Sequence, residues 1–376
     1  MSLSGNQIEI QGEHCMDFSE LIRAFGISGT FQGYEELFVG NINQTYKLQF
    51  LGEQDELKEY ILQRLNTYVF KNPREVMENI RQVTSHIGAQ LGDDAPRRVL
   101  HFRTTADGVP YVENETGFWR AYRYIDRAKT YDIVSADHFE QAGYAYGQFQ
   151  GELADFPVET LHETIPHFHD TPDRMRQLHE AIREDRAGRA TEVQPEIRFI
   201  LDREQQAGVI MEALNSGRIP LRVTHNDTKI NNVLFDTDTD APICVIDLDT
   251  VMPGSALFDY GDAIRSGANT AGEDEEDLSL VHFDLELFER FTAGFLRSAG
   301  ERLTDEEIRL FPQAAQILTL ELCARFLTDY LNGDVYFKVK KPSHNLIRTR
   351  NQIELARQME EHMHEMAAIV EEYSHR

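Results

Sequence analysis

Cysteine is scarce in this chain: Cys15, Cys244 and Cys323 are the only three among 376 residues. They lie far apart and show neither the spacing of a metal site nor a paired framework, so we expect them to be reduced. The chain also lacks an apolar run of the roughly 20 residues that span a bilayer. Its N-terminal segment MSLSGNQIEI has no hydrophobic leader region. These absences predict a cytoplasmic protein without a membrane partner.

Positive charge is also in short supply. The chain has 37 Lys and Arg against 64 Asp and Glu, which gives a net charge of −27. A surplus of this size argues against nucleic acid or anionic membrane as a partner. The length of 376 residues allows two domains, and an apolar fraction of 41% with 22 Phe allows a sizeable core.

Two common phosphate-binding loops are missing. The sequence contains neither G-x-x-x-x-G-K-[ST] nor G-x-G-x-x-G, and internal repeats are absent as well. Nucleotide binding through either of those loops is therefore excluded.

A different pattern is present in VTHNDTKINNVLFD, where His225, Asp227 and Asn232 fit H-x-D-x-x-x-x-N, and Asp247 follows in CVIDLD. Phosphoryl transfer needs a carboxylate that takes or orients a hydroxyl proton, and an amide and a carboxylate that hold Mg²⁺ against ATP phosphates. We assign Asp227 the first task, and Asn232 and Asp247 the second. Lys229 is placed to reach the transferred phosphoryl group. His225 is expected to support the loop by hydrogen bonds.

The surroundings of this pattern decide between two interpretations. An apolar start precedes it, and VLF and ICVIDL predict a hairpin after it, with Asp247 at the end of the second strand. The alternative is a polar loop whose Asp and Asn residues form turns and caps. The hairpin favours the phosphoryl-transfer site. In the following segment we expect Asp259 to hold the loop backbone and Asp262 to pair with Arg265.

The elements divide at about residue 126. Before it, alternating patterns predict strands, and residues 73–90 predict one helix. After it, helical periods dominate. We predict an α+β chain with a small antiparallel-sheet lobe over residues 1–126 and a mostly helical lobe over 127–376. The expected strands are YEELFVG, TYKLQFLG, EYILQRLN, RVLHFRTT, YVEN and FWRAYRYI, and the expected later helices are about 138–153, 172–187, 195–215, 284–299, 305–331 and 351–373.

Three stretches carry a resemblance to a known family: THNDTKINN, VIDLDTVMPG with DYGDAIR, and RFLTDYLNGDVYF followed by HNLIRTRNQ. The chain resembles the aminoglycoside phosphotransferase and choline kinase group, which has the two-lobed, protein-kinase-like fold. Within that group it looks most like N-acetylhexosamine 1-kinases. The resemblance implies ATP and Mg²⁺ as cofactors.

The nucleotide phosphates are expected at the turn that carries Gly40 and Asn43, where glycine lets the backbone come close. Kinase folds also use a strand lysine paired with a helix glutamate. Here Gln63 stands at the lysine position, with Arg64 beside it on the opposite strand face, so the two cannot both serve. Either Gln63 makes a neutral contact with the phosphates, or Arg64 or Lys58 turns inward. Two further residues complete the expected nucleotide contacts: Glu78 as the helix partner, and Ile125 at the link between the lobes.

A sugar pocket needs planar polar groups for hydroxyls and an aromatic face for the ring. The segment from Arg325 to Gln352 offers both, and in the resembled sugar kinases this region lines the acceptor site. We expect substrate contacts from Arg325, Tyr336 and Asn345, and from Asp249, which we place on the same strand face as Asp247.

The sequence therefore predicts an ATP-dependent kinase for a small molecule, with the anomeric hydroxyl of an N-acetylhexosamine as the leading acceptor. Two alternatives stay open. One is a kinase for a cationic acceptor such as an aminoglycoside or choline. The other is a nucleotide-binding pseudokinase, which the missing strand lysine favours and the intact set of Asp227, Asn232 and Asp247 disfavours.

Overall fold

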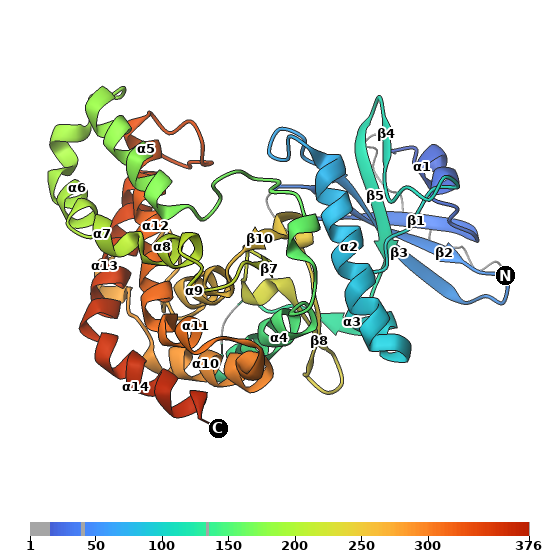
Figure 1. The fold of residues 1–376 in the computed structure, drawn as a ribbon. Coiled ribbons are helices and arrows are strands. Elements are labelled where there is room, and N and C mark those ends of the chain that lie inside the picture. The colour runs from blue at the N-terminus through green and yellow to red at the C-terminus, as the bar shows by residue number, and fades with distance from the viewer. Residues whose placement is uncertain (1–15, 39–41, 133–134, 376) are drawn as a thin grey trace, which may run out of the picture. The chain divides into compact units, whose positions relative to one another are not determined.

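A computed structural model of the chain describes residues 16–38, 42–132 and 135–375 (Figure 1). The chain forms two compact units. The N-terminal unit comprises Met1–Val69 and Phe102–Tyr124, and the C-terminal unit comprises Phe70–His101 and Ile125–Arg376. This division differs from the expected 1–126 and 127–376, because residues 70–101 and 125–126 belong to the C-terminal unit.

The N-terminal unit is built on one antiparallel sheet with the strand order β1-β2-β3-β5-β4. Apolar side chains of β2 and β3 pack with α1 around the buried Trp119. The sheet is the one that the alternating patterns predict. Its elements are α1 (Ser19–Ala24), β1 (Thr30–Leu37), β2 (Gln44–Leu51), β3 (Leu57–Leu65), β4 (Val112–Asn114) and β5 (Gly117–Arg123).

The segment RVLHFRTT is not a strand, contrary to expectation. Only Phe102 forms a bridge, to Tyr122 of β5. The backbone N–H of Arg103 also donates to the carbonyl of Ala121 in β5 at 2.7 Å, beyond the residues of β5 that pair with β4. Val99 and Leu100 are instead buried in the C-terminal unit.

Helix α2 (Pro73–Leu91) is tied to other parts of the C-terminal unit by a buried asparagine. The amide of Asn79 donates to the carbonyls of His162 and Val251 at 2.8 and 2.9 Å, and it accepts the backbone N–H of His162 at 2.9 Å. A fully satisfied buried amide of this kind fixes the helix to its partners.

Helices make up most of the C-terminal unit (Figure 1). Two small sheets hold the region of the catalytic motif: β7 pairs with β10, and β8 pairs with β6 and β9. The remaining elements are α3 (Ala95–Arg98), β6 (Ala128–Lys129), α4 (Ala136–Glu152), α5 (Thr171–Glu184), α6 (Gln194–Leu201), α7 (Glu204–Ala207), α8 (Val209–Asn215), β7 (Arg222–Thr224), η4 (Ile230–Asn232), β8 (Val233–Asp236), β9 (Pro242–Val245), η5 (Leu248–Thr250), β10 (Met252–Gly254), α9 (Ala256–Gly267), α10 (Leu285–Ala299), α11 (Asp305–Arg309), α12 (Phe311–Leu331), α13 (His344–Glu361) and α14 (Met363–Ser374).

Some expected helices are broken or displaced. The helix predicted over 305–331 is interrupted at Leu310, because Pro312 in the first turn of α12 has no N–H to continue the preceding helix. The last helix begins at His344 and not at Asn351, and it breaks at His362. The region predicted over 195–215 folds as α6, α7 and α8.

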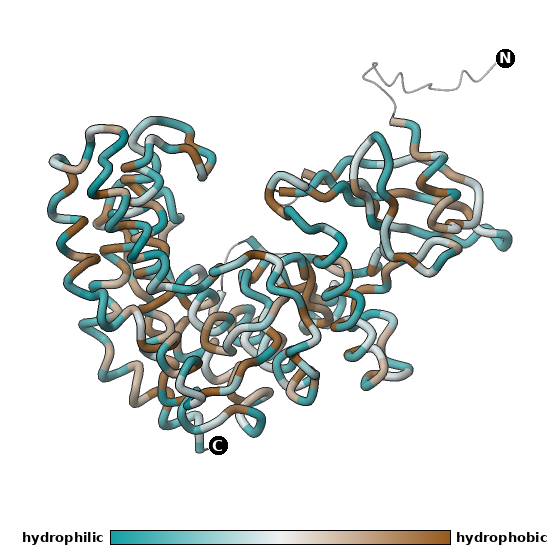
Figure 2. Tube along the Cα trace, turned by 45° about the horizontal axis from the view of Figure 1, so that its top comes forward, coloured by the Kyte–Doolittle hydropathy of each residue, from teal (hydrophilic) through white to brown (hydrophobic). Residues whose placement is uncertain are grey.

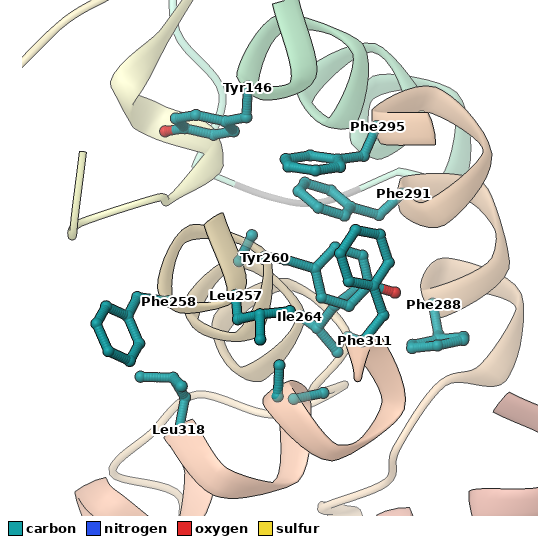
Figure 3. Packing of buried hydrophobic residues seen from close by; sticks show 14 of the residues in the cluster. Tyr146, Leu257, Phe258, Tyr260, Ile264, Phe288, Phe291, Phe295, Phe311 and Leu318 are labelled. Atoms are coloured by element: carbon teal, nitrogen blue, oxygen red, sulfur yellow. The ribbon is translucent and has the colours of Figure 1, made fainter. Parts of the chain in front are cut away.

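Aromatic side chains around α9 form the centre of the C-terminal unit (Figure 3). The ring of Tyr260 stacks on Phe311 with centroids 3.9 Å apart, and its hydroxyl lies 2.6 Å from that of Thr292. A Cβ at Gly261 would lie 2.6 Å from the carbonyl oxygen of Ala314, so α9 and α12 approach closely. Removal of a large buried aromatic ring costs about 3–5 kcal/mol. This packing fixes α9, which carries Asp259 and Asp262.

Hydrophobic and hydrophilic residues alternate along the trace of each unit (Figure 2). None of the helices that the structure describes is long and apolar enough to cross a bilayer.

Candidate active site

The catalytic loop, residues 225–232, is held at both ends by strand pairs. β7 leads into it and pairs antiparallel with β10, with Val223 opposite Pro253. β8 leads out of it and pairs with β9, with Val233 opposite Val245. The backbone on each side of the motif is therefore fixed before any side-chain contact is considered.

Asp259 fastens the first residues of the catalytic loop. Its carboxylate accepts hydrogen bonds from the backbone N–H groups of His225 (3.0 Å) and Asn226 (2.7 Å), and from the amide of Gln150 (2.7 Å). Burial raises the pKa of Asp259, and these donors oppose that rise. Asn226 has a φ of 65°, a left-handed conformation that Asn tolerates better than most residues. Asp259 thus holds a turn immediately before Asp227.

Asp262, one helical turn further along α9, holds the next part of the loop. Its carboxylate accepts from the backbone N–H of Thr228 at 3.1 Å and from the guanidinium of Arg265 at 2.8 Å. Burial alone would raise the pKa of Asp262, but the cations of Arg265 and Lys229 outweigh it and lower the pKa. The expected pair of Asp262 and Arg265 is therefore present, and the same carboxylate positions the loop.

The loop brings the predicted Asp227, Lys229 and Asn232 together. Lys229 Nζ lies 2.6 Å from Asp227 Oδ1, and Asn232 Nδ2 lies 3.3 Å from Asp227 Oδ2. Each carboxylate oxygen faces a donor, which orients the group. Burial would lower the pKa of Lys229, but Asp227 and Asp262 outweigh it and raise the pKa. The amine is therefore a cation at neutral pH.

Asn232 and Asp247 lie next to each other at the end of the β8–β9 hairpin. The N–H of Ile246 donates to the carbonyl of Asn232 at 2.9 Å. Strand β9 ends at Val245, and Asp247 is exposed with a left-handed φ of 60°. The sequence predicted Asp247 at the end of the strand. In the structure it lies two residues beyond the strand.

This pair of residues fits a magnesium ion. The amide nitrogen of Asn232 donates to Asp227, so its oxygen is the atom that would bind the ion. Mg²⁺ is usually held by one or two carboxylates together with substrate phosphates and water. Among the described residues, no group of three or more His, Cys, Asp or Glu side chains is arranged to hold a metal alone. Ligation by Asn232 and Asp247 stays a prediction.

Asp249 does not share a strand face with Asp247. The chain leaves β9 at Val245 and turns through Asp247 into the 3-10 turn η5, where Asp249 is buried. Its contact with a substrate stays a prediction, and its burial speaks against that contact.

His225 supports the loop, as expected. Its Nε2 lies 2.8 Å from the carbonyl oxygen of Ile246, and its Nδ1 accepts the backbone N–H of Asp227 at 3.3 Å. A neutral ring with its proton on Nε2 satisfies both contacts. This histidine is a positioning residue.

His169 approaches the same loop from another segment. Its Nδ1 faces Glu321 Oε1 at 3.1 Å, and its Nε2 faces the carbonyl oxygen of Asn226 at 3.3 Å. Both partners are acceptors, so a protonated ring fits. Burial alone would lower the pKa of His169, but Glu321 outweighs it and raises the pKa. For Glu321, burial would raise the pKa, but His169 and Arg325 lower it.

The predicted acceptor segment contributes an arginine between aromatic rings. The guanidinium of Arg325 lies 5.6 Å from the ring centroid of Phe168 and 5.7 Å from that of Phe337, and 3.5 Å from Glu321. Tyr336 is 71% exposed, and its ring meets Phe337 edge-on. Glu321 thus connects Arg325 to His169 and through it to the catalytic loop.

Asn345 has a structural position. It is fully buried in the first turn of α13, and its amide nitrogen donates to Asp329 (2.8 Å) and Asp334 (2.9 Å). Asp329 in turn accepts the backbone N–H groups of residues 335–337. Asn345 therefore anchors the loop that presents Tyr336, and its own contact with a substrate stays a prediction.

In the N-terminal unit, Gly40 lies outside the described residues. Asn43 Oδ1 accepts the backbone N–H of Asn66 at 3.0 Å, which ties the β1–β2 connection to the end of β3. Arg64 is exposed, and its guanidinium lies 3.3 Å from Gln44 Oε1. Phosphate binding by these residues stays a prediction.

Gln63 is accompanied by a cation that sequence inspection missed. Its Oε1 accepts from Arg120 Nε at 2.9 Å, and its amide donates to Thr45 at 3.1 Å. Arg120 stands directly opposite Gln63 on β5. The pairing joins residues 57 positions apart, so no local pattern could reveal it.

Two further predicted nucleotide residues belong to the C-terminal unit. Glu78 on α2 lies 2.9 Å from His162 Nε2 of the same unit. Ile125 is buried where the chain enters this unit. Their contacts with a nucleotide stay predictions.

Tyr146 and Gln150 on α4 also escaped sequence inspection. The hydroxyl of Tyr146 donates to the carbonyl of Lys229 at 2.7 Å, and Gln150 binds Asp259. One signal was available for Gln150: a polar residue on the buried face of a helix needs a partner.

Comparison with known proteins identifies the family. The model of the phosphotransferase enzyme family matches residues 34–300. Among solved structures, an aminoglycoside phosphotransferase from Alicyclobacillus acidocaldarius is similar with a TM-score of 0.60 and 13% identity, over 97% of this chain and 100% of that one. Amicoumacin kinase hAmiN in complex with AMP-PNP, Ca²⁺ and Ami is similar with a TM-score of 0.56 and 15% identity, over 90% of this chain and 93% of that one. A choline/ethanolamine kinase family protein from Mesorhizobium loti is similar with a TM-score of 0.53 and 14% identity, over 93% of this chain and 98% of that one.

These similarities confirm the expected α+β fold, with an antiparallel-sheet lobe and a helical lobe. The family match confirms the expected class of enzyme. The chain belongs to the phosphotransferase enzyme family, and it is a small-molecule kinase with a protein-kinase-like fold.

Proposed function

We propose that the protein transfers the γ-phosphoryl group of ATP to the anomeric hydroxyl of an N-acetylhexosamine and forms a sugar 1-phosphate. The supporting observation is the charge around the catalytic loop. A cationic acceptor needs clustered acids or an aromatic cage, whereas a neutral sugar needs hydrogen-bonding groups.

Three carboxylates lie near the catalytic loop and Arg325, on the side where we expect the acceptor, and each already has a cationic partner. Asp262 and Glu273 both bind Arg265, at 2.8 and 3.0 Å. Glu321 faces His169 and Arg325, at 3.1 and 3.5 Å. An ammonium group entering here would meet compensated carboxylates and two guanidinium groups, which disfavours it.

In this proposal Asp227 accepts the proton of the acceptor hydroxyl and orients its oxygen toward the phosphorus. Lys229, now 2.6 Å from Asp227, offsets the charge of the transferred phosphoryl group. Mg²⁺, with Asn232 and Asp247 as its protein ligands, would neutralise the nucleotide phosphates. The set of Asp227, Asn232 and Asp247 is complete, which supports a catalytic protein over a pseudokinase.

The nucleotide side of the proposal rests on the N-terminal unit. We assign the phosphates to the segment with Gly40 and Asn43, and we assign the missing positive charge of the strand lysine to Arg120 beside Gln63. ATP as the donor fits the cytoplasmic location that the sequence suggested. Two of the similar structures support a nucleotide donor and a small acceptor by analogy. Amicoumacin kinase hAmiN holds AMP-PNP and Ami, and the protein from Mesorhizobium loti is a choline/ethanolamine kinase family protein.

The product of the reaction tests this proposal. The enzyme is incubated with Mg-ATP and N-acetylglucosamine or N-acetylgalactosamine, and the product is examined by ³¹P NMR for coupling of phosphorus to the anomeric proton. We expect a sugar 1-phosphate. Phosphate on another hydroxyl, or no phosphorylated sugar, would refute the assignment.

A further inference from the structure

A cavity of about 190 Å³ lies beside the catalytic loop, within the C-terminal unit. It exceeds the roughly 150 Å³ at which a protein cavity can hold benzene, so a small ring has room in it. Its lining changes in burial from the exposed Lys229 to the buried Arg265 and Gln352. The cavity is therefore lined both by the amine that contacts Asp227 and by buried residues of the helical unit.

An amide network fixes the orientation of Gln352. The side-chain nitrogen of Asn351 donates to the carbonyl of Gly272 at 3.0 Å, so its oxygen must be the atom that faces Asn269 and Gln352. Both of these residues donate to it, each at 3.1 Å. The nitrogen of Gln352 is therefore committed, and the positions of its two amide atoms cannot be exchanged.

The other amide atom of Gln352 lacks a partner. Its Oε1 is buried and has no hydrogen-bond partner among the described residues, although Gln352 lines the cavity. A buried acceptor without a donor is costly and is rare in native proteins. This oxygen belongs to a residue that lines a cavity next to Lys229 of the catalytic loop, so a molecule bound in the cavity is a candidate donor for it.

The lining also limits the charge of the ligand. Lys229 and Arg265 are cations, but they are paired with Asp227, Asp262 and Glu273. Neither an unpaired acid for a cation nor an uncommitted guanidinium for an anion is found among the lining residues that the structure describes. Ser266 and Asn269 add neutral polar groups. The chemistry fits an uncharged molecule that carries hydroxyl or amide groups.

We propose that this cavity binds the phosphoryl acceptor and that Gln352 Oε1 accepts a hydrogen bond from a hydroxyl or amide N–H of that acceptor. The inference rests on the proposed function and assigns it a specificity-determining residue in addition to the predicted Arg325, Tyr336 and Asn345. The acetamido N–H of an N-acetylhexosamine is one such donor.

Two variants at different lining residues test it. Gln352→Met keeps the length of the side chain and removes the acceptor oxygen. Ala271→Leu fills the cavity and leaves the amide network intact. The matched control is Gln316→Met, since Gln316 is equally buried, has partners in Gln206 and Glu360, and does not line the cavity.

The KM for the acceptor and the KM for ATP are measured with the acceptor that the wild type phosphorylates among N-acetylglucosamine, N-acetylgalactosamine, ethanolamine and choline. We expect Gln352→Met to raise the acceptor KM about 10-fold, the loss of one hydrogen bond, and Ala271→Leu to raise it further. The KM for ATP should stay unchanged in both variants. Gln316→Met should have the wild-type KM for the acceptor and for ATP.

The outcomes separate this inference from the proposed function. A wild-type acceptor KM in both cavity variants would overturn the inference, even if the product is a sugar 1-phosphate; Oε1 would then serve a structural water. If the wild type uses ethanolamine or choline, the sugar proposal fails, and the same comparison of KM values with that acceptor still decides the role of the cavity.

Discussion

Asp259→Asn isolates the positioning of the catalytic loop from the chemistry. The carboxylate receives three donors, at 2.7, 3.0 and 2.7 Å. An asparagine has one oxygen, so its NH₂ group must face at least one of those donors. A hydrogen bond to a charged group is worth about 1.5–3 kcal/mol. The variant no longer buries a charge, which offsets part of this loss, so we expect a net destabilisation of about 2 kcal/mol.

The same loss should appear in turnover. The backbone N–H of Asn226, one residue before Asp227, is held by Asp259. If about 2 kcal/mol of this restraint is lost at the transition state, kcat falls roughly 30-fold, since 1.36 kcal/mol is tenfold. Asp259 is buried and is assigned no ligand contact, so the KM values for ATP and acceptor should change little.

Urea unfolding and steady-state kinetics measure both effects. Asp284→Asn is the matched control, because Asp284 caps α10 and Asn caps a helix as well as Asp does. We expect the control to keep its stability and kcat. A kcat of Asp259→Asn within about threefold of the wild type corresponds to less than about 1 kcal/mol of barrier. If the stability falls but kcat stays in that range, the hydrogen bonds from Asp259 to the catalytic loop do not matter for turnover.

Three other predictions follow from the site. Asp227→Asn should keep the fold and the ATP affinity but lower kcat by about two to four orders of magnitude; turnover within about threefold would contradict its role. Asp247→Ala should abolish the Mg²⁺-dependent turnover of ATP, measured as activity against Mg²⁺ concentration, and an unchanged metal requirement would remove it from the metal site. The His169–Glu321 pair should stabilise the fold most between their ordinary pKa values of 6.5 and 4.5. Its contribution is lost as pH rises through the raised pKa of His169, or falls through the lowered pKa of Glu321. The melting temperature of Glu321→Gln should therefore lie further below the wild type at pH 5.5 than at pH 9, and an equal gap would show that the pair is not ionised.

The sequence predicted the elements whose signal is local. Alternation located β2 and β3, and a proline start located α2. The spacing of H-x-D-x-x-x-x-N located Asp227 and Asn232, whose side chains meet in space. The sequence prediction was wrong where contacts between distant parts of the chain decide the local structure. RVLHFRTT looks like a strand, but its Val99 and Leu100 are buried in the C-terminal unit, and within the segment only Phe102 bridges to β5.

The candidate site shows the same limit. Asp247 was placed on a strand that ends two residues earlier, because the left-handed turn after β9 has no sequence signature. Arg120 and His169 contact partners that are distant in the chain, and the role proposed for Gln352 rests on an unpaired atom. No spacing rule identifies such residues, since their roles appear only when the fold brings the partners together.

The choice of acceptor is the central claim, and one competition measures it. The enzyme and Mg-ATP are mixed with equal concentrations of N-acetylglucosamine, N-acetylgalactosamine, ethanolamine, choline and an aminoglycoside, and the phosphorylated products are identified by mass. We predict that a phosphorylated N-acetylhexosamine is the main product, because the carboxylates on the acceptor side are already paired with Arg265, Arg325 and His169. Phosphorylation of the cationic acceptors in preference to both sugars would contradict the account.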